Sequence, residues 1–109
     1  MAEAAACACG VGDDRKAAGV DPDIKSSNLT RLRRIEGQVR GLQKMVEEER
    51  YCADVLTQIS SVHEALRSVA RELMRNHLKH CASAAFQSGP ENAEAMYDEL
   101  TELFYKHAR

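Results

Sequence analysis

The chain has few aromatic residues, few prolines and few glycines. Of its 109 residues 5% are aromatic, none is Trp, two are Pro and six are Gly. An antiparallel β fold needs a turn about every ten residues, so this composition argues against a sandwich or a barrel. No apolar run approaches the roughly 20 residues that cross a bilayer, and the N-terminal residues lack the features of a signal peptide. We therefore expect a single small domain in the cytoplasm, without a membrane partner.

Disulfide bonds are not expected either, although the chain contains four cysteines. Thiols in the cytosol stay reduced, so metal binding or redox chemistry explains cysteines there better than disulfides do. Cys7 and Cys9 form a C-x-C pair that could chelate a soft metal ion. An incidental pair in an Ala-rich tail is the favoured interpretation. Cys52 and Cys81 lie where the apolar spacing is regular.

The regular spacing begins well inside the chain. Residues 1–26 lack it and are predicted to form a flexible arm, which leaves residues 27–109 as one helical domain. Ser26, Ser27 and Asn28 are candidate N-caps for a first helix. The apolar residues that predict this helix lie three and four apart and are Leu29, Leu32, Ile35, Val39, Leu42 and Val46.

A second helix has an apolar seam of coiled-coil type. Its residues repeat four and three apart and are Val55, Ile59, Val62, Leu66, Val69 and Leu73. The carboxylates of residues 47–49 suit a helix N-terminus better than a helix C-terminus, which predicts a turn near Arg50 and Tyr51. Residues 88–91 (SGPE) end the second helix and begin a third. The predicted fold is all-α with three helices, and so few helices favour an oligomer.

Three potential metal ligands share one stripe of the second helix. At about 100° per residue, His77 and Cys81 lie roughly −20° and +20° from Cys52. They cannot meet within one chain, because 25 residues of helix span about 37 Å. An antiparallel second copy brings Cys52 beside His77 and Cys81 of the partner subunit. The stripe therefore predicts a homodimer with two identical sites.

Two thiolates and one imidazole form a soft donor set. Such a set suits Cu(I), whereas Zn(II) usually takes four ligands and Ni(II) takes more in a squarer arrangement. The alternative is that Cys52 and Cys81 are small packing residues and that His77 is a satisfied polar group. The donor chemistry alone leaves both interpretations open.

Three segments together resemble the copper-sensing repressor family, the CsoR/RcnR group of bacterial metal-responsive regulators. They are residues 29–41 (LTRLRRIEGQVRG), 51–60 (YCADVLTQIS) and 76–81 (NHLKHC), and the resemblance extends over residues 27–107. It implies three helices per chain, a dimer with an antiparallel four-helix bundle, and a dimer-of-dimers tetramer. It also implies an apo-protein that binds operator DNA of copper efflux or chaperone genes and leaves the DNA when metal binds.

By position, Cys52, His77 and Cys81 match the family's copper ligands, with one Cu(I) per subunit at the dimer interface. Tyr51 and Glu99 match residues beside those ligands that couple coordination to helix contacts. The nickel and cobalt sensors of the family use other histidines, the persulfide sensors lack the His, and the formaldehyde sensors generally lack the last Cys. These comparisons favour copper, with a copper chaperone as a possible metal donor.

Basic residues are concentrated in the middle of the chain. Residues 25–81 have a formal charge of +4, and the remainder has −6. Two rows of basic residues are candidate phosphate contacts, Arg31, Arg33, Arg34 and Arg40 on the first helix and Arg67, Arg71, Arg75 and Lys79 on the second. The predicted DNA-binding residues among them are Arg31, Arg33, Arg34, Arg67, Arg71 and Arg75. Arg31 matches an operator-binding arginine of the family. The alternative for Arg75 and Lys79 is pairing with glutamates on the same helix.

Other functions remain as alternatives. A persulfide- or oxidant-responsive repressor would use Cys52 and Cys81, and a nickel- or cobalt-responsive repressor would use the same fold. A copper-buffering protein would need the ligands but not the arginines. An enzyme is not expected, because the chain has no catalytic triad, phosphate loop or obvious carboxylate pair.

Overall fold

The structure is a computed structural model that describes residues 15–107. Cys7, Cys9 and most of the predicted arm lie outside these residues. Within the described part the elements are α2 (Pro22–Glu47), α3 (Cys52–Asn76), the π-helical turn η1 (His77–Ala82), α4 (Ser83–Gln87) and α5 (Pro90–His107). The backbone is helical from Cys52 to Gln87, so the prediction of an all-α fold with three helices is confirmed.

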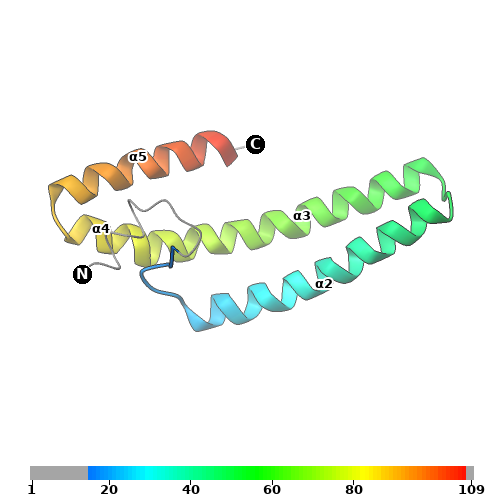
Figure 1. Cartoon of the computed structure of the whole chain (residues 1–109), viewed down its shortest axis with the longest axis horizontal. Coiled ribbons are helices and arrows are strands. Elements are labelled where there is room, and N and C mark those ends of the chain that lie inside the picture. Colours follow the sequence, from blue (N-terminus) through cyan, green and yellow to red (C-terminus); the bar gives the residue numbers. More distant parts are fainter. Residues whose placement is uncertain (1–14, 108–109) are drawn as a thin grey trace. The chain divides into compact units, whose positions relative to one another are not determined.

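The described residues form two compact units. The first unit contains residues 21–74, in which α2 and α3 lie side by side and run in opposite directions (Figure 1). Ile35 of α2 packs with Val62 and Val69 of α3, and Leu42 and Ala65 flank this small core. All five lie in or next to the apolar series predicted for the two helices. Residues three and four apart in such a series share one face of a helix, which here forms the core.

The first helix begins earlier than the sequence predicts. Asp21 is the N-cap, and its side chain accepts hydrogen bonds from the backbone N–H groups of Asp23 (2.9 Å) and Ile24 (3.3 Å). Pro22 follows at the first helical position, where its missing N–H costs nothing. The cap prediction at Ser26, Ser27 and Asn28 was therefore wrong, and residues 22–26, assigned to the arm, are helical. Periodicity could not reveal this turn because it contains too few apolar residues.

The turn between α2 and α3 is where the sequence predicts it. Backbone N–H groups of Glu49 and Arg50 bond the carbonyls of Val46 (3.1 Å) and Met45 (3.0 Å), which is the Schellman arrangement of a helix C-terminus. This arrangement puts Glu49 in the left-handed region, with φ of 54°. Glycine usually occupies that position, because a Cβ atom costs about 1–2 kcal/mol there.

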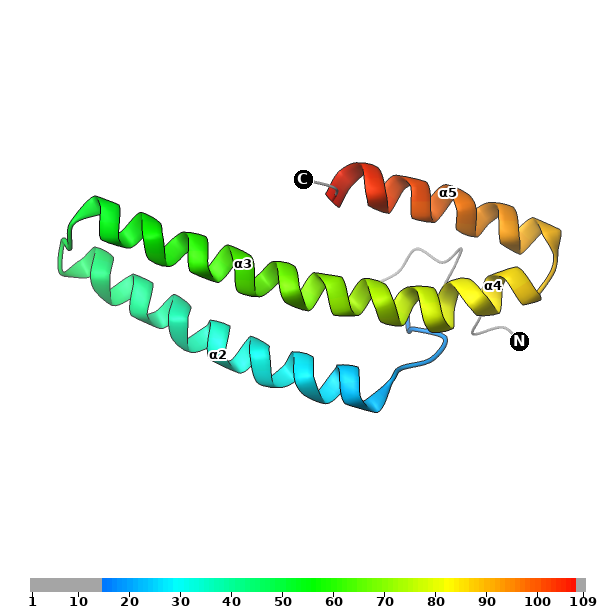
Figure 2. The same ribbon diagram turned by 180° about the vertical axis from the view of Figure 1, so that it is seen from behind.

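The second unit combines the described residues up to Val20 with those from Arg75 onward. In it α4 and α5 form an antiparallel pair (Figure 2). Gly89, with φ of 121°, makes the turn before Pro90, as residues 88–91 predict. Met96 of α5 is fully buried against Cys81, Ala82 and Ala85, so this contact ties α5 to the turn η1.

No helix in the described part of the chain is both long and apolar enough to cross a membrane.

Replacement of Glu49 by glycine tests the strain in the α2–α3 turn. Glu49→Gly should raise the free energy of unfolding by about 0.5–1 kcal/mol, because relief of the left-handed strain exceeds the added entropy of the unfolded chain. Glu48→Gly is the matched control, since Glu48 has φ of −85° and loses the same charge. It should lower the free energy of unfolding. Urea denaturation followed by circular dichroism measures both, and stabilisation by Glu48→Gly alone would contradict the assignment.

Candidate metal centre

His77 and Cys81 lie on a single π-helical turn. The turn η1 runs from His77 to Ala82 and continues directly into α4, because Ser83 keeps right-handed helical dihedral angles. A π turn is wider than an α turn and is frequent at functional sites. The predicted angle of about +20° around the helix axis between Cys81 and Cys52 assumed α-helical geometry throughout. The π turn changes this angle for Cys81. A single wide turn leaves no periodic signal in the sequence.

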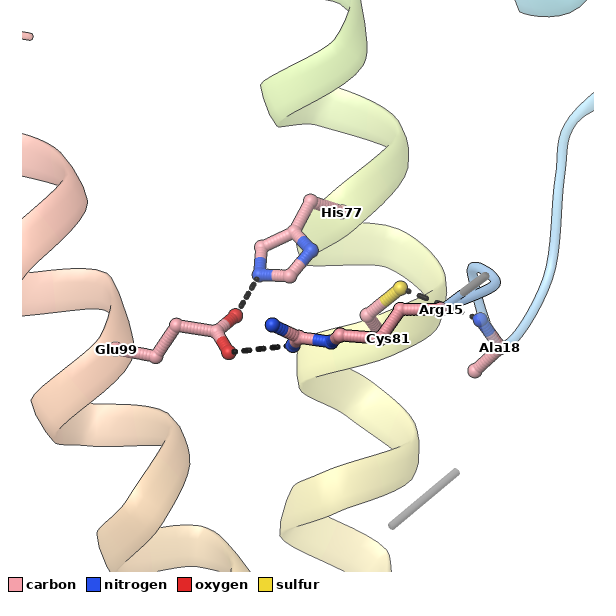
Figure 3. Close-up of polar contacts among 5 residues, drawn as sticks. All are labelled: Arg15, Ala18, His77, Cys81 and Glu99. Atoms are coloured by element: carbon pink, nitrogen blue, oxygen red, sulfur yellow. Dashed lines mark hydrogen bonds and ion pairs between the residues drawn. The ribbon is translucent and has the colours of Figure 1, made fainter. Parts of the chain in front are cut away.

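Glu99 of α5 lies between His77 and Arg15 (Figure 3). Nε2 of His77 is 2.7 Å from Oε2 of Glu99, and Nη2 of Arg15 is 3.7 Å from Oε1. Nε2 of His77 is fully covered and lies beside the Glu99 carboxylate, but it has no well-aligned hydrogen-bond partner among the described residues. The His77 and Glu99 side chains are about one-fifth exposed, at 20% and 21%.

The Cys81 residue is almost fully buried. Cys81 is 2% exposed and packs with Ala82, Ala85 and Met96. Its Sγ accepts a hydrogen bond from the backbone N–H of Ala18 at 3.4 Å, from a segment 63 residues away in the sequence. His77, Cys81 and Glu99 border one open pocket, together with residues 15–17.

Cys52 is in a different environment. It is the first residue of α3, it is exposed, and its thiol is free. It borders an open pocket whose walls are mainly apolar, from Val46, Val55 and Leu56. Tyr51 precedes it and is 74% exposed. Tyr51 and Cys52 belong to the first unit, whereas His77, Cys81 and Glu99 belong to the second.

Within the described part of one chain, no three His, Cys, Asp or Glu side chains gather to hold a metal ion. The turn η1 nevertheless offers two donors of the expected chemistry, the His77 imidazole and the Cys81 thiol. Sulfur and imidazole donors suit Cu(I), which accepts few ligands. One chain thus supplies two of the three predicted ligands on a single turn, and their donor atoms suit a soft metal ion.

All six candidate DNA-binding arginines lie on α2 or α3. Arg31 is half-buried and the other five are exposed, which are Arg33, Arg34, Arg67, Arg71 and Arg75. None of the six forms an ion pair with another described residue. The alternative that Arg75 pairs with a glutamate of its own helix is therefore wrong for the described residues. Arg40, by contrast, pairs with Glu36 at 3.2 Å.

Sequence analysis missed the contribution of Arg15 and Ala18 to the site. Both residues precede the first helix, in the segment assigned to the arm. Their partners lie more than 60 residues away, and Ala18 contributes only a backbone N–H, which no side-chain pattern can reveal.

The fold and the donor set define a class: a helical chain with a thiol–imidazole turn and two long helices whose six candidate arginines form no ion pair with another described residue. A family model described as a metal-sensitive transcriptional repressor matches residues 24–106. The chain belongs to this family, whose members are transcriptional repressors and not enzymes.

Individual relatives narrow the comparison. The chain is 52% identical over 77 residues to the copper-sensing transcriptional repressor RicR of Mycobacterium tuberculosis, which covers 71% of this chain and 80% of that protein. It is 46% identical over 85 residues to the copper-sensing transcriptional repressor CsoR of Bacillus subtilis, or 78% and 82% of the two chains. The structure resembles the Cu(I)-bound CsoR of Geobacillus thermodenitrificans with a TM-score of 0.73 and 40% identity, covering 84% and 93%. The predicted resemblance to copper-sensing repressors is confirmed.

The difference in burial between the two thiols predicts their reactivity. In metal-free protein, iodoacetamide should alkylate Cys52 at least about tenfold faster than Cys81. Cys81 can react only after a local opening of the structure exposes its thiol, and an opening free energy of about 1.4 kcal/mol gives a tenfold difference in rate. Peptide mass spectrometry of a time course separates the two sites. Denatured protein is the control, in which the rates should converge. Equal rates in the folded protein would contradict the burial of Cys81.

Proposed function

We propose that this protein is a Cu(I)-responsive transcriptional repressor of the cytoplasm. The apo-protein binds the operators of copper efflux or chaperone genes, and Cu(I) lowers its affinity for DNA. The observation that carries the proposal is that His77 and Cys81 lie on the same π turn. The chain is also 52% and 46% identical to two copper-sensing repressors over the matched residues. The unpaired arginines on α2 and α3 supply the charge that DNA binding needs.

The exposed apolar surface supports the proposed dimer. Large side chains of both long helices remain exposed in the single chain, namely Leu29, Leu32, Val39 and Val46 of α2 and Leu56, Leu66 and Leu73 of α3. Exposed apolar surface of this extent typically marks a protein–protein interface. A second copy packed antiparallel on it forms the four-helix bundle, and two such dimers form the tetramer.

The complete copper site lies between subunits in this proposal. Cys52 of the partner subunit joins His77 and Cys81 as the third ligand, which gives one Cu(I) per subunit. Exposure of Cys52 at the start of α3 supports this role, because the thiol is available to another chain. A copper chaperone is a suitable metal donor, since transfer between thiolates keeps Cu(I) bound throughout.

Coupling between metal and DNA runs through the contacts of His77. When His77 and Cys81 turn toward Cys52 of the partner subunit, the 2.7 Å contact between His77 and Glu99 must adjust. Because Glu99 is on α5, this change alters the packing of α5 on η1. Tyr51 has the corresponding role beside Cys52. Linkage requires that operator DNA weaken copper binding by the same factor.

The burial of Cys81 weighs against an oxidant sensor, because oxidation of a thiol follows its exposure. A copper-buffering protein would leave without a role the six arginines of α2 and α3 that pair with no described residue. Nickel or cobalt response remains the alternative within the family and is decided by titration.

Metal titration of the protein–operator complex tests the function. Anaerobic Cu(I) should release labelled promoter DNA at one equivalent per subunit, as followed by fluorescence anisotropy, while Ni(II) and Zn(II) at the same concentration should not. Cys52→Ala should abolish release, because it removes one of three ligands. Release by Ni(II) alone would make the protein a nickel sensor, and failure of every metal would end the metal-responsive proposal.

Mixed subunits test the location of the site. Cys52→Ala and Cys81→Ala homodimers each lack a ligand at both sites. In a heterodimer of the two, one site loses two ligands and the other keeps all three, since the Cys52→Ala chain still has His77 and Cys81 and meets the intact Cys52 of its partner. Co-expressed variants should therefore regain one tight Cu(I) site per heterodimer. A site within one chain would regain none.

Substitution of an unpaired arginine tests the DNA surface. Arg71→Ala should weaken operator binding and make its salt dependence shallower, by about 0.9 in the log–log slope for each phosphate that the protein no longer neutralises. Lys106→Ala is the control, because Lys106 is exposed, lies near Glu102 on α5 and belongs to neither row. Anisotropy titrations over a range of salt concentrations measure both. An equal weakening in the two variants would contradict the assignment of the α3 row.

A further inference from the structure

One face of α3 is apolar except for a single histidine. The helix α3 is unbroken from Cys52 to Asn76, so at about 100° per residue the direction of each side chain follows from its number. His63 lies at about +20° from Cys52 around this helix. The other residues between Cys52 and His77 that lie within about 40° of Cys52 carry no charge, and they are Leu56, Ile59, Leu66, Ala70 and Met74. We call these five residues and His63 the dimer face.

The dimer face is open to water in the single chain. Leu56 and Leu66 are 62% and 42% exposed, and His63 between them is exposed as well. The His63 side chain forms no hydrogen bond or ion pair with another described residue. In a separate subunit, water can therefore solvate the imidazole of His63 in both its neutral and its protonated form.

The proposed dimer removes this water. The pairing that brings Cys52 opposite His77 and Cys81 of the partner subunit places the two-fold axis of the dimer close to Leu66. His63 is within one helical turn of that axis, so the two copies of His63 lie about 7–8 Å apart along the helices. Packed helices are about 8–10 Å apart, so both imidazoles enter the same apolar interface.

We propose that His63 makes the dimer sensitive to pH, so that protonation of the two copies separates the subunits. The proposal rests on the function proposed above, because it uses the antiparallel dimer that completes the copper site. A protonated imidazole loses hydration in an apolar interface, and two such charges close together also repel each other. Acid therefore weakens the dimer, and with it every site that needs both subunits.

Charged groups on α3 oppose a proton on His63. Arg67 follows His63 by one turn and lies about 40° from it around the helix, whereas Glu64 points about 100° away. His63 and Arg67 of the partner subunit bring the same charges to the other side of the axis. Each proton on His63 therefore meets like charge from both subunits.

The charged groups of α2 on this side pair with each other. Val39 of α2 and Ile59 of α3 line one open groove, and one turn further along the two helices come Glu36 and His63. The carboxylate of Glu36 is 3.2 Å from the guanidinium of Arg40, and its side chain is 64% exposed. Because Glu36 is paired and solvated, it does little to stabilise a proton on His63.

The direction of the pH effect follows from proton linkage. The separate subunits bind up to two protons more than the dimer, so a fall in pH favours the separate subunits. The dissociation constant of the dimer should therefore rise as the pH falls, by at most about 100-fold per pH unit. Histidine in water gains its proton near about pH 6.5, so the rise should begin close to neutral pH.

Two variants of the full-length, metal-free protein test the proposal. His63→Gln removes the titrating group but keeps a polar side chain on the dimer face. His107→Gln is the matched control, because it removes a histidine at the end of α5, away from α3. Circular dichroism at each pH checks that the helices remain.

Two measurements between about pH 8 and about pH 5.5 follow the dimer, because histidine changes charge within this range. Sedimentation equilibrium gives the dissociation constant. Exchange between isotope-labelled and unlabelled subunits, followed by native mass spectrometry, reports dissociation where the dimer is too tight for sedimentation. Acid should raise the dissociation constant or the exchange rate at least about tenfold in the unmodified protein and in His107→Gln, and less than about threefold in His63→Gln.

The outcomes separate the pH response from the copper function. An equal acid effect in the unmodified protein and in His63→Gln would assign the response to another group and overturn the proposal. A dimer that does not respond to pH would also overturn it, while the Cu(I) titration of the protein–operator complex would still decide the copper function. A protein that is monomeric at every pH would overturn both the pH response and the site between subunits.

Discussion

The contact between Met96 and the turn η1 is the interaction on which the site depends. Met96 is fully buried against Cys81, Ala82 and Ala85, and full burial of a Met side chain stabilises by about 1.5–3 kcal/mol. This contact fixes α5 beside the turn, and Glu99 follows Met96 by three residues, so the same contact brings its carboxylate to His77. One of the residues that make this core is itself a proposed metal ligand. Movement of Cys81 therefore cannot leave α5 undisturbed.

Such a shared role explains how a small ion could control a DNA-binding surface. A packed cluster responds to displacement by moving between discrete arrangements, because its interior has no free space to absorb small shifts. The carboxylate of Glu99 adds an electrostatic element, since it faces His77 on one side and Arg15 on the other. In the single chain the Glu99 carboxylate contacts both His77 and Arg15. In the proposed function, metal coordination by His77 would compete with its contact to Glu99.

Local signals predicted most of the fold. Apolar residues three and four apart located α2 and α3, and Gly89 with Pro90 located the start of α5, because these patterns act within a few residues of the structure that they specify. The turn near Arg50 was predicted correctly, although Glu49 occupies a conformation that usually takes glycine. The start of α2 was predicted five residues or more too late, because its first turn depends on the cap Asp21 and on Pro22 and not on apolar spacing.

The sequence by itself determined the all-α fold, and it predicted Cys52, His77 and Cys81 as metal donors from residue type and spacing together with a family resemblance. Only the tertiary structure decided that His77 and Cys81 lie on a π turn, that Glu99 contacts His77, and that Ala18 and Arg15 complete the surroundings. The physical reason is distance along the chain. Helix periodicity is a local property, whereas the contacts around Cys81 join segments up to 63 residues apart and include a backbone N–H that any residue except proline could supply.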